Sequence, residues 1–183
     1  MYSDIEVQAS FNHLRKVVEI LEEPICILGG WAIFLTVNAR FEKRLKKPYL
    51  GSRDIDLGFH LAKKWNKKQL ENSSFAKALK ALETEGFEST SFRLVKHLDR
   101  QTRKTLSKTE YAKKPMFDII EMYVDLMVDE IPKQFKTTFK MNPVSEQLIK
   151  QVFKNRYFSD NYSSSIRNSS YSPFIIIAFS QKV

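Results

Sequence analysis

Residues 51–61 constrain the fold of this chain most strongly, because their polar and apolar side chains alternate as in a half-buried strand. Asp54 and Asp56 stand two positions apart in this stretch, and Ile55 and Leu57 take the alternate positions. Side chains at i and i+2 on a strand share a face and lie roughly 7 Å apart. We therefore expect a strand that turns its apolar residues to a core and two carboxylates away from it.

A strand–glycine–helix unit precedes this stretch. Residues 25–28 form a short continuous apolar run that ends at Gly29 and Gly30, and residues 31–40 carry apolar side chains at helical spacing. Glycines let the backbone approach a ligand closely, and the first amides of a helix point outward as anion donors. The unit predicts a helix N-terminus that can bind phosphate. Residues 41–50 read as an exposed basic connector to the acidic strand.

The rest of the chain indicates further helices and strands. We expect helices over residues 3–22, up to about Glu85, and over 143–157, and strands over residues 92–98, 116–128 and 173–179. Ser3 and Glu6 would form a capping box on the first helix. The predicted fold class is α/β (α+β), with a mixed β-sheet flanked by helices. Residues 1–140 would form the main domain, and residues 141–183 a C-terminal helix and serine-rich tail packed on it.

A third carboxylate is expected from residues 116–128. If this segment is one continuous strand, Asp118 shares the apolar face of Ile120 and Met122, whereas Asp125 shares the other face with Tyr123. Asp125 is therefore the better candidate for a carboxylate directed out of the core. Asp118 remains the alternative, because a bulge would exchange the two faces.

Charge and cysteine content narrow the environment. Thirty Lys and Arg residues against 21 Asp and Glu give a net charge of +9, which attracts polyanions without choosing among them. Residues 93–114 are the most basic part and form either a solvated loop or a polyanion clamp. The single cysteine, Cys26, excludes an internal disulfide and a cysteine metal site, which favours a reducing cytoplasm. The beginning of the sequence lacks a signal-peptide pattern, and residues 174–179 are too short to span a bilayer, so we expect no membrane partner.

Two motifs together carry a resemblance to a known family. Gly-Gly-Trp-Ala at residues 29–32, a basic spacer, and Ser-Arg-Asp-Ile-Asp-Leu at residues 52–57 resemble the signature of the polymerase-β-type nucleotidyltransferases. Within that superfamily, the motifs most resemble those of the antibiotic adenylyltransferases and the AbiEii-like toxin enzymes. The resemblance covers residues 25 to 130, with a longer gap between Gly30 and Asp54 than in the smallest members. It implies the nucleotidyltransferase fold and Mg²⁺-dependent transfer of a nucleoside monophosphate from an NTP such as ATP to an acceptor hydroxyl.

The resemblance also implies roles for individual residues. Two Mg²⁺ ions would be bridged by the first two aspartates, and the third would hold the metal nearest the acceptor or take the proton of its hydroxyl. The expected catalytic and metal-binding residues are Asp54, Asp56 and Asp125. The expected nucleotide-binding residues are Gly29, Gly30, Ser52 and Arg53.

The acceptor and the class of function stay open in the sequence. The basic surface favours RNA, such as the 3′ end of a tRNA, as the acceptor. The Gly-Gly-Trp and Arg-Asp-Ile-Asp sequences of the two motifs instead favour a small hydroxylated molecule. The alternative is a non-catalytic nucleotide- or RNA-binding module that keeps the fold, or a basic subunit that needs a partner chain. We expect a structural role for His60, which follows the acidic strand, and the sequence identifies no carboxylate partner for His97.

Overall fold

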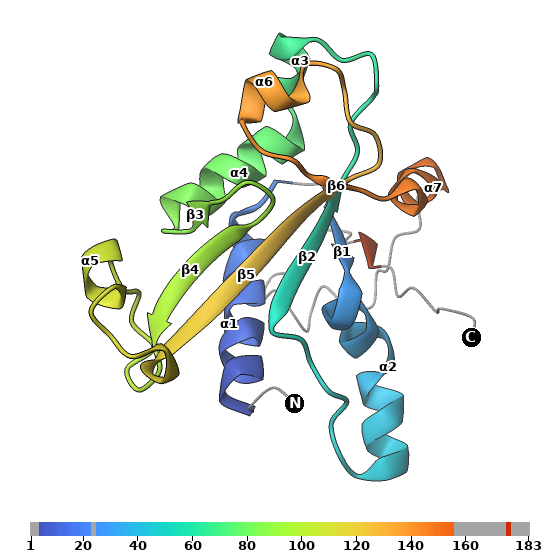
Figure 1. The fold of residues 1–183 in the computed structure, drawn as a ribbon. Coiled ribbons are helices and arrows are strands. Elements are labelled where there is room, and N and C mark those ends of the chain that lie inside the picture. Colours follow the sequence, from blue (N-terminus) through green and yellow to red (C-terminus); the bar gives the residue numbers. More distant parts are fainter. Residues whose placement is uncertain (1–3, 23–24, 156–174, 177–183) are drawn as a thin grey trace.

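The computed structural model describes residues 4–22, 25–155 and 175–176, in which helices flank a mixed β-sheet as the sequence predicts (Figure 1). The helices are α1 (Asp4–Ile20), α2 (Gly29–Leu45), α3 (Lys67–Glu71), α4 (Ser74–Thr84), α5 (Lys108–Tyr111), the 3₁₀ helix η1 (Met116–Asp118), α6 (Phe135–Phe139) and α7 (Gln147–Asn155). The strands are β1 (Cys26–Leu28), β2 (Asp54–Phe59), β3 (Glu88–Ser89), β4 (Leu94–Asp99), β5 (Ile119–Val128), β6 (Val144–Ser145) and β7 (Ile175–Ile176).

The sheet brings the two acid-bearing strands together. Its order is β3-β4-β5-β2-β1-β7, and β6 also pairs with β5. β2 and β5 are parallel neighbours, β1 is antiparallel to β2, and β4 is antiparallel to β5. β7 lies at the edge and pairs with β1, which confirms a late edge strand. The central position of β2 and β5 places their outward side chains between two further strands.

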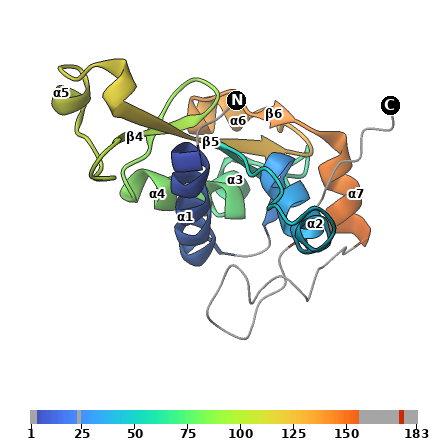
Figure 2. The ribbon, with the colours of Figure 1, turned by 90° about the horizontal axis from the view of Figure 1, so that it is seen from below.

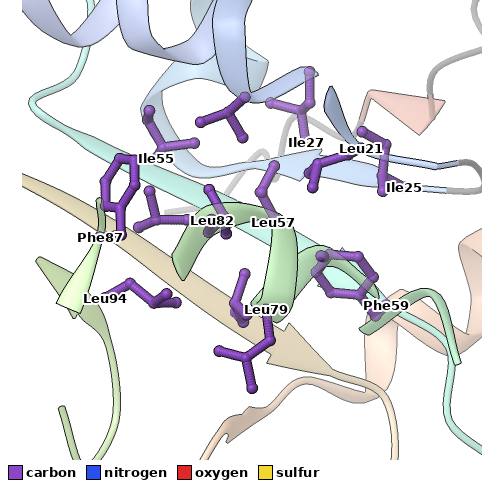
Figure 3. Close-up of a cluster of buried hydrophobic side chains, with 14 of the residues drawn as sticks. Leu21, Ile25, Ile27, Ile55, Leu57, Phe59, Leu79, Leu82, Phe87 and Leu94 are labelled. Atoms are coloured by element: carbon purple, nitrogen blue, oxygen red, sulfur yellow. The ribbon is translucent and has the colours of Figure 1, made fainter. Parts of the chain in front are cut away.

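One face of the sheet is a hydrophobic core, and it follows from the alternation of β2. Ile55, Leu57 and Phe59 have no exposed surface, while Asp54 and Asp56 on the alternate positions are partly exposed. Figure 2 shows α1 and α4 on the same side of the sheet, and Figure 3 shows Leu79 and Leu82 of α4 close to the buried side chains of β2. Full burial of an aliphatic or aromatic side chain contributes about 1.5–3 kcal/mol. This burial fixes which face of β2 carries the aspartates.

The opposite face is covered by α7 at one end. Ile149 and Val152 are buried and pack against Cys26 and Leu28 of β1. Leu148 on the other side of α7 is 51% exposed, and α7 begins at Gln147, later than the predicted start of this helix at residue 143. The buried Cys26 thiol has its pKa raised to about 12 by burial, as expected of an inert core cysteine.

Two further helix boundaries differ from the sequence prediction. α2 continues through residues 41–45, which we expected to be connector; these residues contain no glycine or proline, and the helix ends at Lys46 in a left-handed conformation (φ 55°). The helix expected to end near Glu85 is two helices, because Ser73 caps a new one with its Oγ accepting from the Ala76 amide at 3.1 Å. The expected Ser3 cap and the serine-rich residues 159–172 lie outside the described residues.

Candidate active site

The structure places the three predicted carboxylates on one face of two adjacent strands. Asp56 and Asp125 are partners in the parallel β2–β5 register, and Asp54 lies opposite Tyr123 two positions earlier. Register partners in a sheet point to the same face, and neighbouring strands are about 4.8 Å apart. The expectation that Asp125 faces away from the core therefore agrees with the structure.

Asp118, the alternative third carboxylate, is not brought to this group. The prediction of one strand over residues 116–128 is wrong at its start, because Met116–Asp118 is a 3₁₀ helix with the Asp118 amide bonded to the Pro115 carbonyl at 2.9 Å. Asp118 is partly exposed rather than core-facing. It precedes Asp125 by seven residues, a separation of roughly 23 Å along an extended strand.

The two glycines of the first motif touch the second motif. A β-carbon on Gly29, which has φ +60°, would lie 2.0 Å from Oδ2 of Asp56. A β-carbon on Gly30 would lie 2.8 Å from the Cβ of Ser52. Strand β1 pairs Leu28 with Asp56, and this register brings the glycines to the acidic strand. Both glycines are therefore needed sterically for the β1–α2 corner to close on β2.

The corner also presents a helix N-terminus to the carboxylates. α2 is 17 residues long, begins at Gly29, has no acidic residue in its first turn and has no side-chain cap at Leu28. The first amides of such a helix lack intrahelical partners and carry a partial positive charge. Trp31 anchors this end on α1, because its Nε1 donates to Oγ of Ser10 at 3.0 Å and its ring lies 5.3 Å from that of Phe11. The result is a helix N-terminus that is held beside the acidic strand and whose first amides are suited to an anion.

Arg93 is the site residue that the sequence reasoning missed. Its Nε and Nη2 donate to Oδ1 and Oδ2 of Asp125 at 3.0 and 2.7 Å, and Nη2 lies 3.9 Å from Oδ2 of Asp54. We counted it only as part of the basic segment 93–114. The antiparallel pairing of Leu94 with Val124 sets it opposite Asp125. Only this strand pairing, and no local pattern, could have revealed it.

Tyr123 supports two arginines beside the carboxylates. The guanidinium carbons of Arg93 and Arg53 lie 4.5 and 5.1 Å from the centroid of its ring, within cation–π range. The Tyr123 hydroxyl donates to Glu121, and burial together with this carboxylate raises the pKa of Tyr123 to about 12. Arg53, predicted to bind nucleotide, has its Nε 3.5 Å from Oδ1 of Asp54. The aromatic ring therefore holds both positive charges at the edge of the acidic group.

The three carboxylates carry more negative charge than the two neighbouring arginines neutralise. Burial, followed by the negative charges of Asp125 and Asp54, raises the pKa of Asp56 to about 6, and Arg93 only partly opposes this. Oδ1 of Asp54 is buried and accepts no hydrogen bond from the described residues. A buried carboxylate oxygen that accepts no hydrogen bond is suited to a hard cation such as Mg²⁺, which prefers a few carboxylates plus phosphate and water.

The metal site is nevertheless not preformed. Among the described side chains, no three His, Cys, Asp or Glu residues converge as a group able to hold a metal ion. Within the triad of Asp54, Asp56 and Asp125, both oxygens of Asp125 accept hydrogen bonds from Arg93. The donor chemistry of Asp54 and Asp56 thus fits Mg²⁺, while the charge of Asp125 is already balanced by the Arg93 guanidinium.

His60 and a pocket next to its partner Asp129 lie away from the three carboxylates. The Asp129 carboxylate is buried, accepts from the Leu61 and Glu130 amides at 2.8 Å each, and pairs with His60, which braces the ends of β2 and β5. A pocket of about 470 Å³ beside it does not include the triad; its lining residues are Lys63, Asp129, Glu130, Ile131, Ser145, Gln147, Lys150 and Gln151.

His97 has a carboxylate partner that the sequence did not identify. Its Nε2 lies 3.5 Å from Oε1 of Glu121, and its ring stacks on Tyr111 at 3.8 Å. The β4–β5 register sets His97 directly opposite Glu121.

Comparisons with known proteins add no relative. No protein-family model, no curated protein and no solved structure gives a significant match to this chain. None of the helices in the described ranges combines the length and apolar character needed to cross a bilayer.

Proposed function

We propose that this chain is a Mg²⁺-dependent nucleotidyltransferase that moves a nucleoside monophosphate from an NTP, such as ATP, to an acceptor hydroxyl. The observation that carries the proposal is the position of Asp54, Asp56 and Asp125 on one face of β2 and β5, with Gly29 at the start of α2 packed against Asp56. Carboxylates suited to a divalent ion and a helix N-terminus suited to phosphate are the two parts that bind a metal–triphosphate complex.

The side chains have separate tasks in this proposal. When bound, two Mg²⁺ ions supply neutralisation of the charge on the triphosphate and the departing pyrophosphate. Asp54 and Asp56 are the residues that would hold them, and Asp125 is the third ligand or the proton acceptor. The Gly29 and Gly30 amides receive the phosphates.

The proposed transfer moves one proton, forms one bond to phosphorus and breaks another. The acceptor hydroxyl loses its proton to the Asp125 carboxylate, its oxygen bonds to the α-phosphorus, and the bond from that phosphorus to pyrophosphate breaks. Ser52, which lies beside Gly30, and Arg53, which lies beside Asp54, are placed to orient the triphosphate. Most of the rate gain would come from positioning and charge neutralisation, as in phosphoryl transfer generally.

The test is transfer of label from α-labelled NTPs to RNA and to small hydroxylated acceptors with Mg²⁺. Wild type is compared with Asp54→Asn and Asp56→Asn, which keep side-chain volume and remove one charge each. We expect transfer by the wild type and a loss of at least roughly 100-fold in each variant, as for groups that stabilise a transition state electrostatically. Transfer that survives both substitutions contradicts the proposal.

Salt dependence separates the two acceptor classes. Within the basic segment 93–114, residues 101–113 are mostly exposed, which favours a polyanionic acceptor. Binding of a single-stranded RNA through several phosphates should weaken with salt, with a log–log slope of about −0.7 per phosphate contact. A neutral small acceptor should show almost no slope.

A second candidate function is a non-catalytic nucleotide-binding module. The observation that favours it is the double hydrogen bond of Arg93 to Asp125, which leaves the third carboxylate engaged. Calorimetry with NTP and Mg²⁺ distinguishes the two functions. Binding without release of pyrophosphate on any acceptor or on water supports the module, whereas metal-dependent release of pyrophosphate excludes it.

A further inference from the structure

Arg93 occupies both oxygens of Asp125 in a planar, bidentate pair. The Nε–Oδ1 and Nη2–Oδ2 distances are 3.0 and 2.7 Å, which are those of a strong charge-assisted pair. The same guanidinium reaches to 3.9 Å from Oδ2 of Asp54. It therefore lies between the carboxylates of Asp125 on β5 and Asp54 on β2.

We propose that Arg93 competes with the divalent ion for Asp125, so that the full metal site forms only when nucleotide binding releases this pair. The inference rests on the proposed function and adds to it a mechanism of regulation at the same site. The guanidinium takes one lone pair of each Asp125 oxygen, and its positive charge lies between Asp125 and Asp54, where an ion shared by the two carboxylates would have to lie. The guanidinium and the ion therefore bind Asp125 in alternation.

The charges of the site favour this exchange only when a triphosphate arrives. In the free protein three carboxylates face two guanidinium groups, those of Arg93 and Arg53. Two divalent ions alone would bring four positive charges beside two arginines, which is electrostatically unfavourable at short range. A triphosphate carries enough negative charge to offset them and offers phosphate oxygens to the released guanidinium. Metal and nucleotide should consequently bind with positive coupling.

The local structure lets the side chain of Arg93 move while its backbone stays. The backbone is fixed by the Arg93 amide to Oγ1 of Thr90 at 3.2 Å and by the Thr90 amide to the Arg93 carbonyl at 2.8 Å. The side chain is 27% exposed, and its guanidinium carbon lies 4.5 Å from the Tyr123 centroid. This aromatic surface can keep the released guanidinium next to the site. The exchange needs rotation of one side chain and no movement of a strand.

Arg53 differs from Arg93 in this respect. Its Nε is 3.5 Å from Oδ1 of Asp54, and that oxygen accepts no hydrogen bond among the described residues. Asp54 therefore keeps an oxygen that can accept a metal while Arg53 stays in place. Competition with the ion is assigned to Arg93 alone.

The experiment measures Mn²⁺ binding to the full chain by the loss of the free-ion electron paramagnetic resonance signal, with and without a non-hydrolysable NTP analogue. Variants are Arg93→Met, which removes the competing cation, and Arg93→Lys, which keeps the charge and loses the bidentate geometry. Lys114→Met is the matched control, since it removes one positive charge paired at 2.7 Å with Asp99, an aspartate outside the triad. Circular dichroism confirms that each variant is folded.

We expect Arg93→Met to bind Mn²⁺ without nucleotide at least roughly tenfold more tightly than wild type, about 1.4 kcal/mol of relieved competition. Arg93→Lys should be intermediate, Lys114→Met should match wild type, and adding Asp125→Asn to Arg93→Met should abolish the gain. The analogue should tighten Mn²⁺ binding much more in wild type than in Arg93→Met.

Equal or weaker nucleotide-free Mn²⁺ binding by Arg93→Met overturns the inference, as does an equal gain in Lys114→Met. Failure of the proposed function is a separate result. It would appear as no pyrophosphate release by wild type. The Mn²⁺ affinities are measured without turnover, so they test the role of Arg93 independently of that result.

Discussion

Gly29 and Asp56 lie so close that a β-carbon on Gly29 would be 2.0 Å from Oδ2 of Asp56. This contact joins the first residue of α2 to the middle carboxylate of the triad, across the register pair of Leu28 and Asp56. It explains in steric terms why the two sequence motifs occur together. The β1–α2 corner and the acidic strand form one packed unit.

The contact predicts the effect of Gly29→Ala. The positive φ alone should cost about 1–2 kcal/mol of unfolding free energy, and the clash with Asp56 should add to it. The variant should also lose nucleotide binding, because either the corner or the carboxylate must shift. Urea unfolding of Gly29→Ala, Asp56→Ala and the double variant separates the two costs. A coupling of about 0.5–3 kcal/mol in favour of the double variant is expected; strictly additive effects would show that the two residues do not meet.

The pKa of Asp56 predicts a pH-dependent stability. A carboxyl whose folded pKa is about 6, against 3.8 without perturbation, binds protons more tightly in the folded state. The free energy of unfolding therefore falls as pH rises from about 4 to 6, by at most about 3 kcal/mol, and then stays level with respect to this group. Asp56→Asn should be more stable than wild type at pH 8, with the difference vanishing towards pH 4. Urea titrations at these two pH values, with Asp118→Asn as the control, check the sign; an Asp56→Asn variant less stable than wild type at pH 8 would refute it.

The buried Asp129–His60 pair is predicted to act on stability alone. His60→Ala removes one partner from a buried carboxylate and should lower the unfolding free energy by about 1–3 kcal/mol. Asp129→Asn, which weakens the same contact from the other side, should behave alike. Transfer activity at a temperature where both variants are fully folded should stay within about twofold of wild type, since neither residue reaches the triad. A loss of activity in folded protein would assign His60 to the chemistry.

Elements with strong local patterns could be predicted from the sequence. The alternation around Ile55 and Leu57 predicts β2 and its two faces, because burial of alternate residues determines which face a strand turns to the core. The same counting selects Asp125 over Asp118, although η1 replaces the start of the expected strand. These predictions depend only on neighbours in the sequence.

The features that the sequence did not reveal depend on contacts between distant segments. Arg93 reaches Asp125 only through the β4–β5 register, and His97 finds Glu121 in the same way. The extension of α2 to Leu45 was missed because basic residues suggested a connector, although they are also good helix formers. Local composition predicts an element, whereas strand pairing decides which of its side chains meet.

The most direct test of the central claim is release of pyrophosphate from an NTP, dependent on Mg²⁺ and an acceptor, compared among wild type, Asp125→Asn and Asp118→Asn. These variants remove the same charge from two positions of one segment, only one of which shares a face with Asp54 and Asp56. We expect wild-type and Asp118→Asn activities within about twofold of each other, and a loss of at least roughly 100-fold in Asp125→Asn. Full activity of folded Asp125→Asn, or equal losses in both variants, would contradict the assignment of the Asp54–Asp56–Asp125 face as the active site.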